Sequence, residues 1–128
     1  MRLFKVMESM VDAITGKGVD KSSIEAAEGA LGLSFSQEYR AYLERYGIAA
    51  VNGHELTGIC KSDRTNVVSV TQSAKRIHKT ENDWYVVEQT NIDGVVIWQA
   101  TDGAIYRTTP SATNTRKICE SLAIYIEL

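Results

Sequence analysis

Residues 98–107 decide the fold, and they read Trp98-Gln99-Ala100-Thr101-Asp102-Gly103-Ala104-Ile105-Tyr106-Arg107. Runs rich in β-branched and aromatic residues, which favour strands, lie on both sides of the Asp102-Gly103 pair. An Asp-Gly pair accepts the positive φ angles that a two-residue hairpin turn requires. The stretch therefore predicts an antiparallel hairpin in which Ala100 lies opposite Ile105 and Trp98 lies opposite Arg107.

A third strand precedes this hairpin in the sequence. Residues 84–90 have the same strand-like composition as residues 95–101, and the segment Asn91-Ile92-Asp93-Gly94 between them provides a four-residue turn. Pro110 closes the last strand, because proline has no N–H to donate to a neighbouring strand. Residues 84–109 are therefore predicted to form a β-meander of three antiparallel strands.

Helices are predicted on both sides of the meander, from apolar residues that recur at helical spacing. The expected ranges are residues 3–14, residues 22–31, a helix from Ser34 or Ser36 to Tyr46, residues 66–77, and a last helix from Thr115 onward. Between the third and fourth helices, residues 48–53 are expected to form a loop and residues 55–60 an extended segment.

Local signals set the expected ends of these helices. Ser22 and Glu25 match a capping box at the start of the second helix. Glycines at positions 16, 18, 32 and 47 are expected to end the first three helices. The order indicates an α+β fold: an antiparallel sheet with a β-meander, flanked by N-terminal helices and a C-terminal helix, with the helices on one side of the sheet.

Composition places the chain among ordinary globular proteins. Its 128 residues fit one domain over 1–128, and an apolar content of 44% gives no sign of disorder. Fourteen basic residues against 16 acidic ones argue against a nucleic-acid partner, which requires an excess of cations. No stretch resembles a signal peptide or approaches the ~20 apolar residues that span a bilayer, so we expect a cytoplasmic protein without membrane contact.

Few residues could carry catalysis or bind a metal. His54 and His78 are the only histidines, and neither they nor Cys60 and Cys119 show the spacing of metal ligands or of a catalytic motif. The two cysteines have apolar neighbours and are interpreted as buried thiols. We therefore expect no enzymatic activity, no metal site and no cofactor.

Several stretches in a fixed order resemble the SMI1/KNR4 (SUKH) family. They are residues 24–33 with residues 39–47, then residues 53–59, and finally residues 98–107. The family shows an I-x-x-x-E-x-x-L-G-x-x-L-P-x-x-Y-x-x-x-L pattern across the first of these, and Ser36 stands here in place of its usual proline. The resemblance covers roughly residues 22 to 128 of the chain.

This resemblance implies an α+β domain without enzymatic activity and with a role in protein binding. Bacterial members of the family are commonly immunity proteins against toxins, often nucleases, whereas fungal members act in cell-wall signalling. It favours an immunity protein that binds and neutralises a cognate bacterial toxin by direct contact. A non-catalytic scaffold in another regulatory assembly is the alternative, and a small enzyme has the least support in the residue inventory.

The meander provides the candidate partner-binding residues. With both turns at their predicted lengths, one face carries Tyr85, Val87, Val96, Trp98, Ala100 and Ile105 and lies under the helices. The other face mixes aromatic and polar side chains, as binding surfaces do, with Trp84, Glu88, Gln99 and Tyr106 near its centre and Glu81 and Asp83 at its rim. The alternative is that a loop or the N-terminal helix covers this face, and a one-residue change of register would exchange the two faces.

Overall fold

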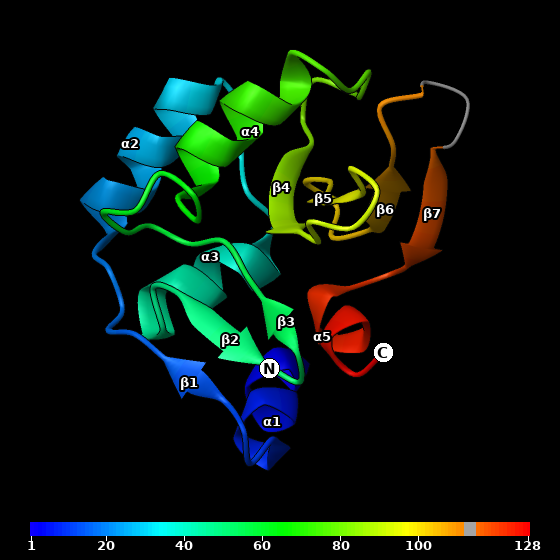
Figure 1. The fold of residues 1–128 in the computed structure, drawn as a ribbon. Helices are drawn as coiled ribbons and strands as arrows, with labels where there is room; N and C mark the ends of the chain where they lie inside the picture. Colours follow the sequence, from blue (N-terminus) through cyan, green and yellow to red (C-terminus); the bar gives the residue numbers. More distant parts are fainter. Residues whose placement is uncertain (112–114) are drawn as a thin grey trace.

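The structure is a computed structural model that describes residues 1–111 and 115–128. These residues form α1 (Arg2–Ser9), β1 (Ile14–Thr15), α2 (Lys21–Leu31), α3 (Gln37–Arg45), β2 (Ala49–Val51), β3 (His54–Glu55), α4 (Val67–Lys75), β4 (Tyr85–Gln89), β5 (Val96–Gln99), β6 (Ile105–Thr108), β7 (Arg116–Cys119) and α5 (Leu122–Ile126) (Figure 1). Strands β1 to β3 form a small sheet, and β4 to β7 form a four-stranded sheet in chain order. All these strands pair antiparallel, which confirms the predicted α+β class.

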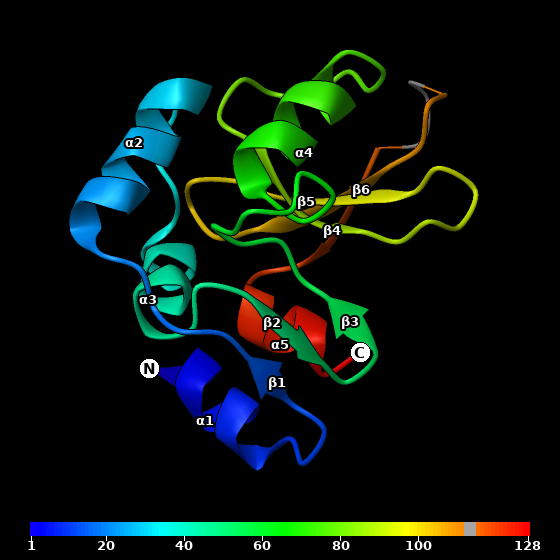
Figure 2. The ribbon, with the colours of Figure 1, turned by 60° about the vertical axis from the view of Figure 1, so that its left-hand side comes forward.

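Helices cover both faces of the four-stranded sheet, whereas the sequence predicts helices on one side only. Helix α4 lies on one face, where its Val70 and Ala74 belong to the same buried cluster as Trp98 (Figure 2). Helices α3 and α5 lie against the other face, which contributes Tyr85 and Ile105 to the main core. Because both faces are covered, β4 and β5 are buried along almost their whole length.

The predicted antiparallel hairpin forms, but the predicted register is wrong by one residue. Ile105 lies opposite Gln99, where the sequence predicts Ala100, and Trp98 lies opposite Tyr106. A shift of one residue moves a side chain to the other face of the sheet. Trp98 and Tyr106 therefore share a face, and Ile105 lies on the opposite one.

The length of the loop causes this shift. Residues 101–103 connect the strands, and the Ala100 N–H donates to the Ala104 carbonyl oxygen at 2.9 Å. Within the loop only Gly103 has a positive φ, of 100°, so Asp102 does not take the second left-handed position that a two-residue turn requires. Its carboxylate accepts a hydrogen bond from the Ala104 N–H instead, at 3.0 Å.

A β-bulge adds a second irregularity, between β4 and β5. Val86 lies opposite Trp98, but Glu88 lies opposite the residue just before Trp98, which leaves Val87 as an extra residue. Val87 joins Tyr85 in the main core, while Trp98 faces α4. The predicted grouping of Tyr85, Val87 and Trp98 on one face is therefore wrong.

The N-terminal third contains more strand than predicted. Helix α1 ends at Ser9, and Ile14–Thr15 form β1, which pairs with β2. Residues 48–53, predicted to be a loop, contain β2 and a tight turn at Asn52-Gly53, where the φ angles are 51° and 78°. The predicted capping box at the start of α2 is also wrong, because Asp20 is the cap and accepts the Ser23 N–H at 2.9 Å.

The predicted helix from Thr115 is wrong at its start. Arg116–Cys119 form β7, which pairs with β6, and α5 begins only after Ser121. The predicted caps at Ser36 for α3 and at Asn66 for α4 are confirmed. In the described part of the chain, no helix has the length and apolar character that crossing a bilayer requires.

A carboxylate from α3 holds α5 in place against the sheet. Glu38 accepts hydrogen bonds from the backbone N–H groups of Leu122 at 2.7 Å and Ala123 at 3.0 Å, which are free donors in the first turn of α5. The same carboxylate accepts the side-chain N–H of Gln99 at 2.9 Å. Three elements that are distant in sequence are thus tied together at one end of the sheet.

Candidate partner-binding surface

Trp84 and Tyr106, two of the predicted site residues, lie together on the α4 face of the sheet. Their rings stack with centroids 4.1 Å apart and planes 14° apart. Trp84 is only 7% exposed, and Tyr106 in β6 is half-buried. Fully buried Trp98 backs the pair, with its ring centroid 6.5 Å from that of Trp84. The stack is therefore a rigid aromatic platform whose accessible part is chiefly Tyr106.

Strand β7 adds charged residues beside this platform that the sequence prediction missed. Lys117 lies opposite Tyr106, and its Nζ atom is 2.6 Å from the carboxylate of Glu120. The sequence predicts a helix over this segment, so it does not predict that β7 pairs with β6. The segment Arg116 to Cys119 is too short for an alternating pattern to stand out, so the sequence carries no signal for it.

Glu81 and Asp83, the predicted rim residues, are exposed on the segment that leads from α4 into β4. This segment is fixed to α4, because the Lys75 Nζ donates to the Asn82 carbonyl oxygen at 2.8 Å. Burial lowers the pKa of Lys75, while nearby Asp83 acts in the opposite direction. Both carboxylates are therefore held near Trp84 and remain available to a partner.

Glu88 and Gln99 do not share this surface, because both are buried on the other face of the sheet. Gln99 is fully buried: its side-chain oxygen accepts hydrogen bonds from the hydroxyls of Tyr85 at 2.8 Å and Ser36 at 3.1 Å. Glu88 is 6% exposed. The predicted common face that joined them to Trp84 and Tyr106 is therefore wrong, for the reasons of loop length and bulge given above.

Glu88 lies at the centre of a buried polar cluster that joins β3, β4 and α5. Its carboxylate accepts the Tyr125 hydroxyl at 2.5 Å and the Glu55 backbone N–H at 3.0 Å, and it lies 2.9 Å from His54 Nδ1. Burial raises the pKa of Tyr125 well above its ordinary range, with a further contribution from Glu88. The cluster therefore fastens α5 to the sheet through Glu88, and it includes a histidine whose protonation adds a charge to the contact.

This cluster predicts a specific dependence of stability on pH. The hydrogen bond to Glu88 raises the pKa of His54 above 6.5 despite partial burial, so the folded state binds this proton more tightly than the unfolded chain. The resulting stabilisation is complete below the unfolded pKa and is lost as pH rises through the higher folded pKa. We expect the free energy of unfolding in urea to fall more between about pH 6 and about pH 8 in the wild type than in His54→Gln.

The second histidine serves as an internal reference for that measurement. His78 Nδ1 is 2.7 Å from the Thr108 hydroxyl, and burial lowers the pKa of His78. It therefore favours folding as pH rises, and this opposite contribution is present in both proteins and cancels in the comparison. Equal pH dependence in the wild type and in His54→Gln would show that the His54–Glu88 contact contributes nothing.

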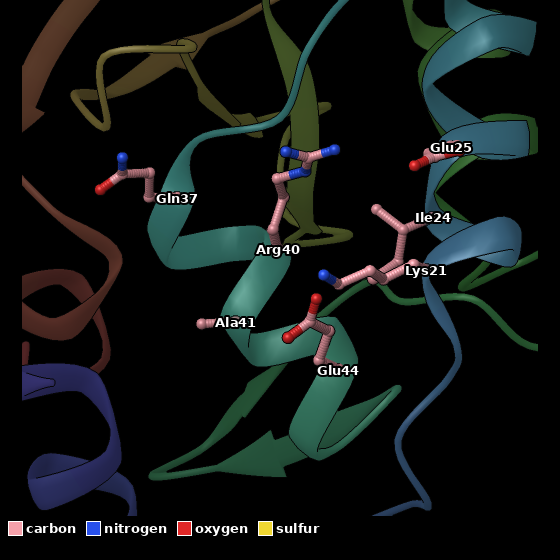
Figure 3. A pocket seen from close by; sticks show the side chains of 7 residues that line it. All are labelled: Lys21, Ile24, Glu25, Gln37, Arg40, Ala41 and Glu44. Atoms are coloured by element: carbon pink, nitrogen blue, oxygen red, sulfur yellow. The ribbon is translucent and has the colours of Figure 1, made fainter.

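A concave surface lies between α2 and α3, with a volume of about 320 Å³. Ile24 belongs to its lining, and Figure 3 shows Lys21 of α2 and Glu44 of α3 pointing toward one another across it. Arg40, which also lines it, pairs with Glu28 at 3.0 Å. Because charges of both signs neighbour each other, this groove gives little preference for a partner of either charge.

No three His, Cys, Asp or Glu side chains gather closely enough to hold a metal ion within residues 1–111 and 115–128. Cys60 and Cys119 are free thiols, and both are partly buried. Across the same residues, every buried side-chain nitrogen or oxygen has a hydrogen-bond partner. The predicted site residues that lie at the surface therefore provide an aromatic platform with charged groups near it.

An α+β domain with helices on both faces of an antiparallel meander is the class that the fold defines. The family model described as SMI1-KNR4 cell-wall matches residues 4–127, so the chain belongs to the SMI1-KNR4 (SUKH) family. The resemblance seen in the sequence is thereby confirmed. No curated protein gives a significant match.

A solved structure supports the fold at low sequence identity. It is described as "Crystal structure of protein from Pseudomonas syringae pv. tomato", and it superposes with a TM-score of 0.75 at 12% identity. The match covers 97% of this chain and 95% of that one. At this identity the likeness establishes the shared fold alone.

Proposed function

We propose that this protein is an immunity protein that binds a cognate bacterial toxin, such as a nuclease, and neutralises it by direct contact. The family match over residues 4–127 carries the proposal, because the family's bacterial members commonly have this role. In this proposed role the protein acts in the cytoplasm, as one domain over residues 1–128. It performs no chemistry and needs no metal, cofactor, nucleic acid or membrane.

The surface around Tyr106 is the proposed contact region. Aromatic anchors that are already rigid lose little conformational freedom on binding, and they dominate the energetics of many interfaces. Tyr106 is held by its stack with Trp84, and Glu81 and Asp83 stand nearby in solvent. Such an arrangement suits a partner with a complementary basic rim.

Co-expression with the product of the neighbouring gene tests the proposal. If that product stops growth, this protein should restore growth and should co-purify with it as a stable complex. Growth rescue by a catalytic route would leave the toxin modified and no complex to isolate. A neighbouring product that is harmless, or one that stays toxic in the presence of this protein, would contradict the proposal.

Tyr106→Ala should weaken the complex by about 2 kcal/mol, because it removes an anchor at the centre of the contact. The dissociation constant and the two rate constants, measured by surface plasmon resonance, should show the loss mainly as faster dissociation. Tyr46→Ala is the matched control, since Tyr46 is also half-buried but packs against Phe4 of α1.

Charge reversal at the rim should act differently from truncation of the anchor. Glu81→Lys with Asp83→Lys should slow association and leave dissociation almost unchanged, and the effect should fade as salt is added. Unchanged association at low salt would show that these two carboxylates lie outside the interface.

A binding scaffold in another regulatory assembly is the second candidate. The family description itself refers to the cell wall, which favours a role outside toxin neutralisation. Isolation of the native complex distinguishes the two functions. A stable partner that has no toxicity of its own would support the scaffold.

A further inference from the structure

A groove beside α4 is not part of the aromatic surface described above. It consists of two adjoining hollows of about 230 and 410 Å³ that share Ser73 of α4 and Gln89 of β4. Gln89 ends β4, whereas Trp84 lies just before its first residue. The groove and the aromatic platform are therefore at opposite ends of the same strand.

The smaller hollow is mainly apolar. Its lining includes Ala74, Ile77, Val95, Val96 and Pro110. Ile77 is 64% exposed, because α4 ends at Lys75 and does not carry this residue inward as the sequence pattern predicts. An exposed large apolar side chain in the lining of an apolar hollow is typical of a docking site.

The walls of this hollow are fixed before anything binds. His78, a further lining residue, is held by the Thr108 hydroxyl at 2.7 Å, and that hydroxyl also accepts the Trp98 indole N–H at 2.7 Å. The turn opposite is formed by left-handed residues at Asn91 and Asp93, with φ angles of 58° and 53°. A preformed hollow gains affinity because little conformational freedom is lost when it is filled.

The larger hollow is polar and contains a free cation. Arg76 lines it, and its guanidinium makes no hydrogen bond or ion pair with residues 1–111 or 115–128. The carboxylate on the same lining, Asp63, accepts a hydrogen bond from Ser69 at 3.2 Å. Lys79, close by in the sequence, is also exposed. The planar fork of an arginine matches a carboxylate with two parallel hydrogen bonds.

We propose that this groove binds an extended acidic segment of a protein partner, with an apolar side chain in the smaller hollow and a carboxylate on Arg76. The side-chain amide of Gln89, between the two hollows, is placed to bond the backbone of that segment. The inference rests on the proposed function only in requiring that the protein act by binding another protein.

A peptide titration followed by amide NMR tests the groove without a known partner. The probes are three capped tetrapeptides of sequence EDLE, EDAE and KKLK, added to the isotope-labelled protein. EDLE should shift the resonances of Ala74, Gln89 and Val96. EDAE should bind about tenfold more weakly, because it lacks most of the buried apolar side chain. KKLK should not bind in the groove.

Two variants and their controls locate the site of binding. Ile77→Asp and Arg76→Glu should each abolish the shifts caused by EDLE. Val11→Asp and Lys21→Glu introduce the same charge changes at exposed positions elsewhere and should leave the titration unchanged. Shifts outside the groove, no shifts at all, or equal binding of KKLK would overturn the inference.

The cognate toxin, once isolated, separates this inference from the proposed function. If the protein carrying both Ile77→Asp and Arg76→Glu neutralises the toxin as well as the wild type, immunity stands and the groove is not its contact. If EDLE binds in the groove while no neighbouring product is neutralised, the groove stands and the immunity proposal fails.

Discussion

Replacing Gly58 by alanine is expected to unfold the protein. An added Cβ atom would lie 2.0 Å from the carbonyl oxygen of Gly47 and 2.9 Å from the Ile48 Cα atom, distances at which no side-chain movement gives relief. The obstructing atoms are backbone atoms, and hydrogen bonds hold both sides of the contact. The Ile59 N–H donates to that same Gly47 oxygen at 3.0 Å, and the Val67 N–H donates to the oxygen of Gly58 itself at 2.8 Å. We expect a loss above about 4 kcal/mol, a large fraction of a typical stability.

Gly29→Ala is the matched control for this substitution. Gly29 lies within α2, and an added Cβ atom would meet no atom within 4 Å. Alanine favours a helix interior by about 1 kcal/mol over glycine, so this variant should be more stable than the wild type. Circular dichroism and urea unfolding measure both variants. A Gly58→Ala protein with native helix content and unchanged stability would show that the backbone contact is not as close as described.

The sequence predicts those elements that local signals control. The caps at Ser36 and Asn66 and the strands of the meander need only neighbouring residues, and they form as expected. Gly18 is different. The sequence predicts that it ends a helix, whereas in the structure an added Cβ atom at this position would lie 1.7 Å from the Glu44 carbonyl oxygen. Its role comes from a contact between segments that are distant in the sequence.

The turns show how small a difference separates a correct prediction from a wrong one. Asn52-Gly53, within the predicted loop, takes positive φ at both residues and makes the two-residue turn that the sequence assigns to Asp102-Gly103. Asp102 keeps a negative φ and uses its carboxylate to bind the Ala104 N–H. The two pairs thus take different geometries, although both are typical of a two-residue hairpin turn.

The candidate site was therefore predictable in part. Trp84 and Tyr106 meet as the alternation of residues implies, because the bulge and the change of loop length leave both on one face. Glu88 and Gln99 are buried because helices cover the second face as well, and Gln99 depends on Glu38, distant in the sequence, for one of its hydrogen bonds. A pattern of alternating residues cannot reveal how many layers cover a sheet.

Trp98→Ala should destabilise the protein by roughly 3–5 kcal/mol, as expected for removal of a large buried aromatic side chain. Trp98 is fully buried between α4 and the sheet, and its indole N–H bonds the Thr108 hydroxyl at 2.7 Å. The substitution leaves a cavity beneath the Trp84–Tyr106 stack. It also removes the indole N–H that donates to the Thr108 hydroxyl, the group that holds His78. Urea unfolding monitored by circular dichroism measures the loss.

Trp84→Ala and Tyr106→Ala complete the comparison along the same stack. Trp84 is 7% exposed, so Trp84→Ala should also lower the free energy of unfolding by several kcal/mol. Tyr106 is half-buried, so Tyr106→Ala should lower it clearly less. Binding measured on folded protein should then decrease most for Tyr106→Ala, because its ring is the accessible part of the platform. If Trp98→Ala unfolds at the same urea concentration as the wild type, Trp98 is not a core residue. The sheet faces would then have to be assigned again, starting from the register of β5 against β6.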